Sequence, residues 1–429
     1  MSSMLKSSGS PSFNPSAEES MYRKTVLKNG VRVVTETIPY VRSVSVGVWA
    51  NVGSRDERPD QNGITHFLEH MVFKGTKKRS IREIARSIES RGGYLNAFTT
   101  KENTCFYARI LDINISHTVD VLSDLVRNAT FNQGEMEKEK LVVLEELKSS
   151  EDDPEDVVHE YFERALFPNH SLGLPIIGCE RNLMNFQRSH LRTHVVSHYA
   201  PSNVVIAAAG NVDHSKLVSL SEKFFSSMSQ TGAPQMRKAP SSSDDRPKKL
   251  DHTKKIHQAH VCLGRRAYSA KHKQRYPLLL LNTLLGEGMS SRLYQSVRER
   301  HGLAYSIYSF VNLLSDTGVF GTYVATDEKN VANAIDLIFK ELGKLRSKSV
   351  SKAELERTKS QIKGTMMLGL ENMSGRMMRL GSSEMVFEEY VPIQTVLDNI
   401  DRVTVEGIHR VAKELFVEEQ FSTVIIRPS

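Results

Sequence analysis

The amino-acid sequence predicts an α+β protein built from two tandem homologous units, each a mostly antiparallel sheet covered by helices. Three observations lead to this prediction. The chain of 429 residues is too long for one compact core and has room for two domains. Segments with strand periodicity alternate with segments of helix periodicity in both halves. The order of these segments before residue 228 recurs after residue 257, as expected for an internal repeat.

The elements of the first half follow from hydrophobic periodicity and turn residues. A strand pair around the Asn29-Gly30 turn, an alternating strand, a hairpin and a buried strand are expected at residues 22–38, 44–52, 94–110 and 203–211. Helices are expected at residues 63–73, 80–91, 116–128, 132–150, 154–166, 185–199 and 215–227. Asn132 has the features of an N-cap residue and starts the fourth helix.

A segment rich in Ser, Pro and charged residues, 229–256, separates the two halves and is typical of a linker. The elements expected beyond it are a strand at 259–264, a helix at 278–285, a hairpin at 305–325, helices at 330–345 and 351–370, terminal helices and a strand at 422–426. We therefore predict a disordered tail at 1–21, an N-terminal domain at 22–228, the linker, and a C-terminal domain at 257–429.

The composition is that of a soluble globular protein, with 39% hydrophobic and 25% charged residues. The three cysteines, Cys105, Cys179 and Cys262, are far apart, which argues against a disulfide framework and a cysteine-based zinc site. The net charge of +7 is spread along the chain, and no aromatic residues interleave with its lysine cluster, so nucleic-acid binding is not expected. The chain has no run of about 18 apolar residues, so no membrane span is expected.

The expected helix at residues 63–73 carries the most informative pattern, His66-Phe-Leu-Glu69-His70. Its apolar residues form one stripe that faces a core, whereas His66, Glu69 and His70 lie on the complementary stripe. Two imidazoles one turn apart can share a tetrahedral metal ion, and a carboxylate beside them can reach a water bound to that ion. The order H-x-x-E-H is the inverzincin signature. A solvated helix face can carry the same residues, so the pattern needs a third ligand.

The expected helix at 132–150 offers Glu139, Glu145 and Glu146 as a third ligand. Glu139 and Glu146 are two turns apart and share one face, whereas Glu145 points elsewhere. Solvated glutamates are common on such helices, so helical position alone leaves the choice open. The second half has Leu280-Leu281-Asn282 where the histidines would recur. Only the first half carries the polar set, which favours a functional site over a structural one.

The string HFLEHMVFKGT at residues 66–76 resembles the inverzincin zinc peptidases of the pitrilysin/insulinase type. The resemblance covers essentially everything after the tail. It is greatest to the shorter branch, which holds the bacterial processing peptidases and the catalytic β subunit of the mitochondrial processing peptidase. Glu146 follows His70 at the distance at which this family carries its third ligand. The resemblance implies one zinc ion per chain, held by His66, His70 and Glu146.

Further roles follow from the same resemblance. Glu69 is expected to be the base that activates water, with Glu139 as a supporting catalytic residue. Asn96 and Ala97 match the edge strand that pairs with an extended substrate peptide. Arg298 and Tyr305, seven residues apart, match a pair that holds substrate in relatives. Either residue alone would be explained by a surface charge or by core packing, and their joint spacing favours substrate binding.

The expected function is therefore that of a zinc metalloendopeptidase that cuts peptides, unfolded polypeptides or targeting-presequence-like segments held extended. Relatives enclose substrate between two double-unit halves, so a homodimer, or a heterodimer with a related subunit, is expected. The N-terminal residues lack a firm targeting signal, which favours the bacterial cytoplasm over the mitochondrial matrix. A non-catalytic scaffold or a peptide-binding subunit of the same fold is the alternative. The acidic run 151–156 could attract basic peptides, or its acidic residues could simply stabilise the N-terminus of a helix.

Overall fold

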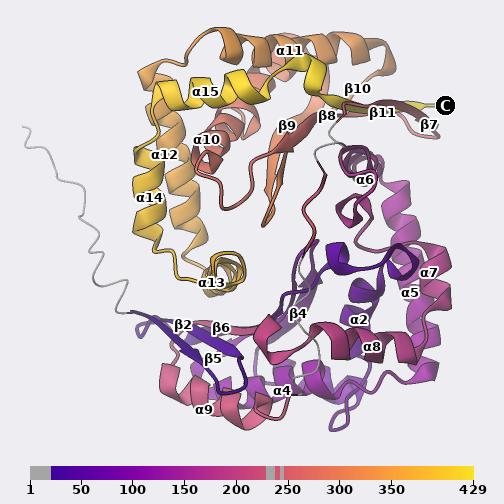
Figure 1. Cartoon of the computed structure of the whole chain (residues 1–429), viewed down its shortest axis with the longest axis vertical. Helices are drawn as coiled ribbons and strands as arrows, with labels where there is room; N and C mark the ends of the chain where they lie inside the picture. Colours follow the sequence, from indigo (N-terminus) through magenta and orange to yellow (C-terminus); the bar gives the residue numbers. More distant parts are fainter. Residues whose placement is uncertain (1–20, 229–236, 242–245) are drawn as a thin grey trace, which may run out of the picture.

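The computed structural model describes residues 21–228, 237–241 and 246–429, which form two sheets with their covering helices (Figure 1). The first sheet has the strand order β1-β2-β6-β3-β5-β4, and the second has the order β7-β11-β8-β10-β9. Strands β2 and β6 pair in parallel, as do β11 and β7, and the remaining pairs are antiparallel. The predicted α+β fold with two mostly antiparallel sheets is confirmed.

The first sheet and most of its helices come from the first half of the chain. The strands are β1 (Tyr22–Val26), β2 (Arg32–Thr37), β3 (Ser43–Ala50), β4 (Tyr94–Thr99), β5 (Thr104–Leu111) and β6 (Val204–Gly210). The helices are α2 (Ile64–Val72), α3 (Ile81–Glu89), α4 (Ile115–Asn128), α5 (Gln133–Asp152), α7 (Glu180–Asn185), α8 (Arg188–His198) and α9 (His214–Phe225). The helix predicted at 185–199 corresponds to α8, and α7 before it was not predicted. Phe186 adopts an extended conformation between the two helices.

The second sheet is built from the second half. Its strands are β7 (Lys249–Lys254), β8 (Ala259–Ala267), β9 (Ala304–Leu313), β10 (Gly318–Thr326) and β11 (Ser422–Pro428). The helices are α10 (Arg275–Gly286), the π-helix Tyr294–Arg300, α11 (Val331–Ser347), α12 (Lys352–Gly369), α14 (Ile393–Asp401) and α15 (Val405–Leu415).

Strand β7 lies inside the segment predicted as a linker, 229–256. It is an edge strand that pairs only with β11, so its polar side chains can face water and its sequence resembles a linker. Residues 229–236 and 242–245 of the predicted linker, and residues 1–20 of the predicted tail, lie outside the described residues.

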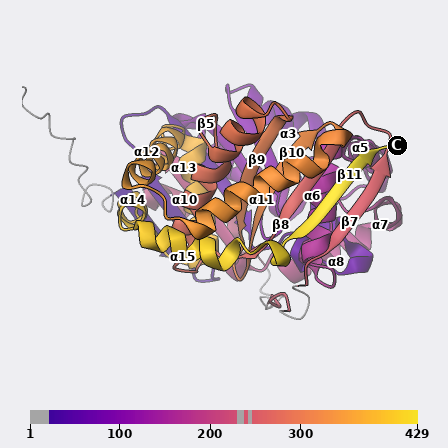
Figure 2. The same ribbon diagram turned by 90° about the horizontal axis from the view of Figure 1, so that it is seen from above.

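The two halves of the chain exchange one helix each. These are α6 (Pro154–Leu166) from the first half and α13 (Met373–Phe387) from the second. Phe162 of α6 is buried with Cys262 of the second sheet, and Met377 of α13 is buried with Trp49 of the first sheet. Figures 1 and 2 show α6 against β8 and β11, and Figure 1 shows α13 beside β2 and β6. The predicted division of the chain near residue 228 therefore does not describe how these two helices pack, because each packs on the sheet of the other half.

None of the helices in the described part of the chain combines the length and the apolar character needed to cross a membrane.

Candidate metal centre

Helix α2 presents its polar stripe because the opposite face is buried. Ile64, Phe67, Leu68 and Met71 lie in the core of the first half, as the periodicity predicts. Gly63 precedes the helix at a φ of +96°, and a Cβ there would lie 2.6 Å from the carbonyl oxygen of Ile177. Only glycine fits this position, which sets the direction in which the helix leaves the loop.

A buried carboxylate, Glu57, caps the N-terminus of α2. It accepts hydrogen bonds from the backbone N–H groups of Gly63 and Thr65, each at 2.7 Å, and from the side-chain amide of Asn62 at 2.9 Å. Burial raises the pKa of Glu57 to about 7, although these hydrogen bonds act in the opposite direction. The sequence pattern does not indicate this residue, because Glu57 lies in the preceding loop and not at the usual N-cap position.

Three side chains from α2 and α5 converge at the candidate metal centre. The Nε2 atoms of His66 and His70 lie 3.7 Å and 3.4 Å from the carboxylate oxygens of Glu146. In the part of the chain that the structure describes, this is the one group of three such side chains whose ligand atoms all lie within 4.8 Å of one another. Zinc–ligand bonds of about 2.1 Å in a tetrahedral site place neighbouring ligand atoms about 3.4 Å apart. The three donors therefore have a spacing that fits one zinc ion.

A hydrogen bond orients the ring of His70. Its Nδ1 donates to Oε1 of Glu139 at 2.9 Å, which leaves the Nε2 lone pair facing the centre. The other oxygen of Glu139 lies 2.6 Å from Nζ of Lys74. Burial alone would raise the pKa of Glu139, but the hydrogen bonds with His70 and Lys74 outweigh it and lower the pKa. The predicted support residue is therefore an ionised partner of His70 and lies on the same face of α5 as Glu146.

His66 is suited to be a neutral ligand. Burial, together with the adjacent His70, lowers the pKa of His66 to about 4. Its Nδ1 is buried and has no hydrogen-bond partner among the residues that the structure describes. For His70, burial is outweighed by the hydrogen bond to Glu139 and the charge of Glu146, so the pKa is raised. A zinc ligand histidine must be deprotonated, and two imidazoles with one carboxylate are a donor set that zinc accepts.

Glu69 lies beside the three donors and points toward strand β4. Its Oε2 accepts a hydrogen bond of 2.6 Å from Oγ1 of Thr99, the last residue of that strand. Burial raises the pKa of Glu69, opposed by the Thr99 hydrogen bond. Thr99 falls within the hairpin predicted at 94–110, but the sequence gave no sign of this contact, which joins residues thirty positions apart.

The centre opens into a cavity of about 1110 Å³ between the two halves. His66, Glu69 and Glu146 line it, and so does Ala97 of the edge strand. Asn96 lies on the same strand, and its Oδ1 accepts a hydrogen bond from the Ala97 N–H. Strand β4 pairs only with β5, so one side of its backbone faces away from the sheet. The structure thus brings the predicted edge strand to the metal donors.

Arg298 and Tyr305 lie together but not at this centre. Arg298 donates to the carbonyl oxygen of Tyr305 at 2.9 Å, and its guanidinium lies 4.6 Å from the Tyr305 ring centroid. The Tyr305 residue is 77% exposed, and neither residue is among those that line the cavity. Their contact with a substrate stays a prediction.

Two family models match consecutive parts of the chain. Residues 32–180 match the model described as Insulinase (Peptidase family M16), and residues 185–362 match the Peptidase M16 inactive domain. The first match contains the three metal donors, and the second covers much of the half that lacks them.

Relatives match along almost their whole length. The chain is 41% identical over 409 residues to uncharacterized zinc protease YmxG of Bacillus subtilis, covering 95% of this chain and 99% of that protein. It is 34% identical over 408 residues to an uncharacterized zinc protease of Rickettsia felis, covering 93% and 96%.

Solved structures agree in fold. A protease from Helicobacter pylori superposes with a TM-score of 0.88 at 25% identity, covering 95% of this chain and 99% of that one. A peptidase M16 inactive domain from Pseudomonas fluorescens gives a TM-score of 0.89 at 16% identity, covering 95% and 98%, and supports the fold alone.

Proposed function

The chain belongs to the insulinase peptidase family M16, and we propose that it is a zinc-dependent endopeptidase that cleaves peptides held in an extended conformation. The observation that carries this proposal is the convergence of His66, His70 and Glu146 beside Glu69, at the wall of a cavity bordered by an edge strand. The names of the relatives support a zinc peptidase. The endopeptidase activity, the substrate and the individual residue roles are our proposal.

One zinc ion per chain would be held by His66, His70 and Glu146, with Glu139 keeping His70 oriented. When bound, the ion supplies a Lewis acid that lowers the pKa of water and polarises the scissile carbonyl. Glu69 takes a proton from the attacking water while the oxygen of that water bonds to the carbonyl carbon. Glu69 then delivers the proton to the amine nitrogen as the carbon–nitrogen bond breaks. Thr99 holds the Glu69 carboxylate against the edge strand.

Strand β4 is proposed to hold the substrate by backbone hydrogen bonds along Asn96 and Ala97. Such pairing reads little side-chain information and accepts many sequences. Side-chain preference would come from the cavity, which has seven acidic side chains against one lysine, Lys101. The acidic residues are Glu69, Glu102, Glu146, Asp153, Asp156, Glu160 and Glu163. This charge favours peptides with basic residues, including segments that resemble targeting presequences.

A second chain would complete the enclosure of the substrate. Family resemblance supports a homodimer, or a heterodimer with a related subunit, and Arg298 and Tyr305 would contact substrate from the second half of the chain. Light scattering of the purified protein tests the homodimer, which should have twice the mass of the chain, and a monomer would favour the heterodimer.

The proposed mechanism is tested with Glu69→Gln. This variant should keep zinc at one ion per chain and lose about 10²- to 10⁴-fold in turnover of a peptide library, because only the proton carrier is removed. Glu145→Gln is the matched control, since Glu145 lies beside Glu146 but points to Lys148 at 2.7 Å. It should match wild type in zinc content and turnover.

Either of two results would overturn the proposal. Equal turnover by Glu69→Gln and wild type would exclude Glu69 as the base. A wild-type protein that binds zinc and extended peptides without cutting them would establish the peptide-binding alternative.

A further inference from the structure

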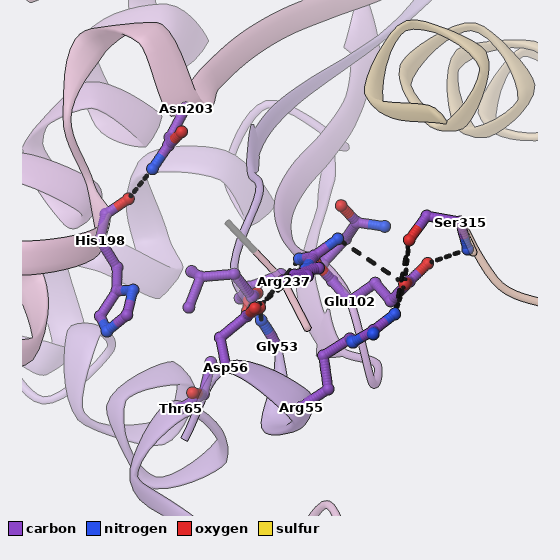
Figure 3. A network of polar contacts seen from close by, with 12 residues as sticks. Gly53, Arg55, Asp56, Thr65, Glu102, His198, Asn203, Arg237 and Ser315 are labelled. Carbon is purple, nitrogen blue, oxygen red and sulfur yellow. Dashed lines mark hydrogen bonds and ion pairs between the residues drawn. The ribbon is translucent and has the colours of Figure 1, made fainter. Parts of the chain in front are cut away.

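Four chain segments meet beside the cavity and join the two halves of the molecule. They are loop 53–57, the β4–β5 turn at 100–103, residues 237–238 and the β9–β10 turn at 314–317. Their interlinked polar side chains, most of which Figure 3 labels, are called the clasp. The clasp consists of Arg55, Asp56, Glu102, Arg237, Ser315 and Asp316.

Arg55 is the centre of the clasp, with a side chain that is 1% exposed. Its two Nη atoms each donate to a different carboxylate oxygen of Asp316 at 3.0 Å, and Nη1 also forms a short ion pair with Glu102. Glu102 in turn accepts from the backbone N–H of Ser315 at 3.0 Å and from its hydroxyl at 2.6 Å. One guanidinium therefore links a turn of the first half to a turn of the second.

Arg237, from the segment between the two halves, also binds loop 53–57 and the β4–β5 turn. It donates to both carboxylate oxygens of Asp56 at 2.9 and 2.8 Å, and to the backbone carbonyl of Glu102. The loop and turn are also in backbone contact, because a Cβ on Gly53 would lie 2.4 Å from the Thr100 carbonyl oxygen. The first-half side of the clasp is thus one closely packed unit.

The β4–β5 turn also contacts α6, the first-half helix that packs on the second sheet. Lys101 of this turn lies 2.8 Å from Glu163 of α6. Charged contacts between the second half and the first sheet also occur at α13, where Glu384 pairs with Lys24 and Arg32 and Arg376 pairs with Glu36. The clasp is the charged contact that lies at the end of the edge strand.

The clasp adjoins the ends of two strands, β4 and β9, that carry residues proposed to bind substrate. On one side, strand β4 ends at Thr99, which holds Glu69. On the other side, strand β9 runs from Ala304 to Leu313, so Tyr305 lies at the end opposite the clasp. A rotation of the second half about the clasp would move Tyr305 relative to the edge strand and leave the metal donors in place.

We propose that the clasp sets the orientation of the second half relative to strand β4, with Asp316 as a positioning residue for substrates that span both halves. Buried guanidinium–carboxylate pairs add little net stability, but their two-point geometry is strongly directional. The apolar and polar contacts of α6 and α13 hold the halves together, and the clasp adds a directional contact beside the end of strand β4. The kinetic part of this inference rests on the proposed function.

A distance measurement tests the proposal without any catalysis. Cys179 is exposed, whereas Cys105 and Cys262 are buried, so one added cysteine on the second half completes a spin-label pair. Lys413→Cys on α15 supplies it. Pulsed electron–electron double resonance should give one narrow distance distribution for this background. Adding Asp316→Asn should broaden or split the distribution, and Ser315→Ala should do so less.

The matched control is Glu354→Gln. Glu354 accepts two hydrogen bonds of 2.9 Å from Arg292 and is similarly half-buried, but both partners belong to the second half. Its distance distribution should equal that of the background.

Kinetics provide the second readout. For Asp316→Asn, the KM for a long peptide that spans both halves should rise about tenfold. The kcat for this peptide should change less than about twofold. A short peptide confined to strand β4 and the zinc affinity should be unaffected. A merely structural defect would change all of these together.

Asp316→Asn behaving like Glu354→Gln in both readouts would overturn the proposal. Absence of cleavage by wild type would refute the proposed function alone, because the distance measurement still decides the role of the clasp.

Discussion

At the scale of single residues, burial decides the chemistry of the glutamates around α2. Glu57 and Glu69 are both removed from water, and burial raises the pKa of each. Glu139 is also buried, yet its pKa is lowered, because His70 and Lys74 both bond to it. Three glutamates close to one another therefore differ in pKa according to their burial and their hydrogen-bond partners.

Glu57 makes stability depend on pH. Its pKa is raised from 4.5 to about 7 on folding, so the folded state binds its proton more tightly than the unfolded state. The resulting stabilisation is fully present below pH 4.5 and is lost as the pH rises through about 7. Glu57→Gln removes this titration. The free energy of unfolding of wild type relative to Glu57→Gln should fall by about 3 kcal/mol between pH 4.5 and about pH 8.

Urea denaturation at a series of pH values, with a chelator present, measures this difference. Glu83→Gln is the control, because Glu83 caps α3 at the surface and not in the interior. Parallel pH profiles for wild type and Glu57→Gln would show that Glu57 does not titrate in this range.

The residues of the centre differ in how far the sequence reveals them. His66, Glu69 and His70 share one helix, so their relative positions follow from the helical period. Glu146 and Glu139 could be chosen only by family spacing, since exposed glutamates are common. Glu57 and the Thr99–Glu69 contact could not be predicted, because they depend on how separate segments pack.

At the scale of elements, periodicity located helices and strands well where one face is buried. Helix α6 was predicted with the bounds that the structure has, 154–166. Strand β7 was not predicted, because an edge strand on a solvated side has no apolar alternation. Which of the two sheets α6 covers could not be predicted either, because the apolar stripe of α6 fits both sheets. Exchange of α6 and α13 is a property of tertiary packing alone.

Helix α13 gives a test of this exchange. Its Gly381 faces the first sheet, where an added Cβ would lie 2.3 Å from two ring atoms of Trp49. Gly381→Ala should therefore push α13 off the sheet and lower the free energy of unfolding by about 1–3 kcal/mol. Trp49 is the sole tryptophan and is 3% exposed, so its fluorescence should shift to longer wavelength as water reaches the ring.

Gly364→Ala on α12 is the matched control for helix propensity, because nothing lies within 4 Å of its added Cβ. It should leave the fluorescence unchanged and stabilise the protein by up to about 1 kcal/mol. Unchanged fluorescence and stability in Gly381→Ala would contradict the described packing of α13.

At the scale of the whole molecule, the cavity lining is acidic although the chain as a whole is basic. The chain carries a net charge of +7, yet the cavity between its halves has seven acidic side chains and one lysine. Composition could not reveal this acidic lining, because its residues come from α2, α5, α6, the α5–α6 junction and the β4–β5 turn and meet only after folding. A cavity lined by acidic side chains attracts cations more strongly than the net charge of the chain predicts.

The cavity charge leads to a prediction for substrate preference. A peptide with arginine or lysine beside the cleaved bond should have a higher kcat/KM than its neutral analogue, and this advantage should shrink as salt rises from about 0.05 M to about 0.5 M. Glu160→Gln should reduce the advantage because Glu160 lines the cavity, whereas Glu418→Gln, at an exposed site outside it, should not. Parallel salt profiles for the basic and neutral peptides would mean that the cavity charge does not select substrates. The preference would then have to come from pairing with β4 alone, which reads the backbone and not the side chains.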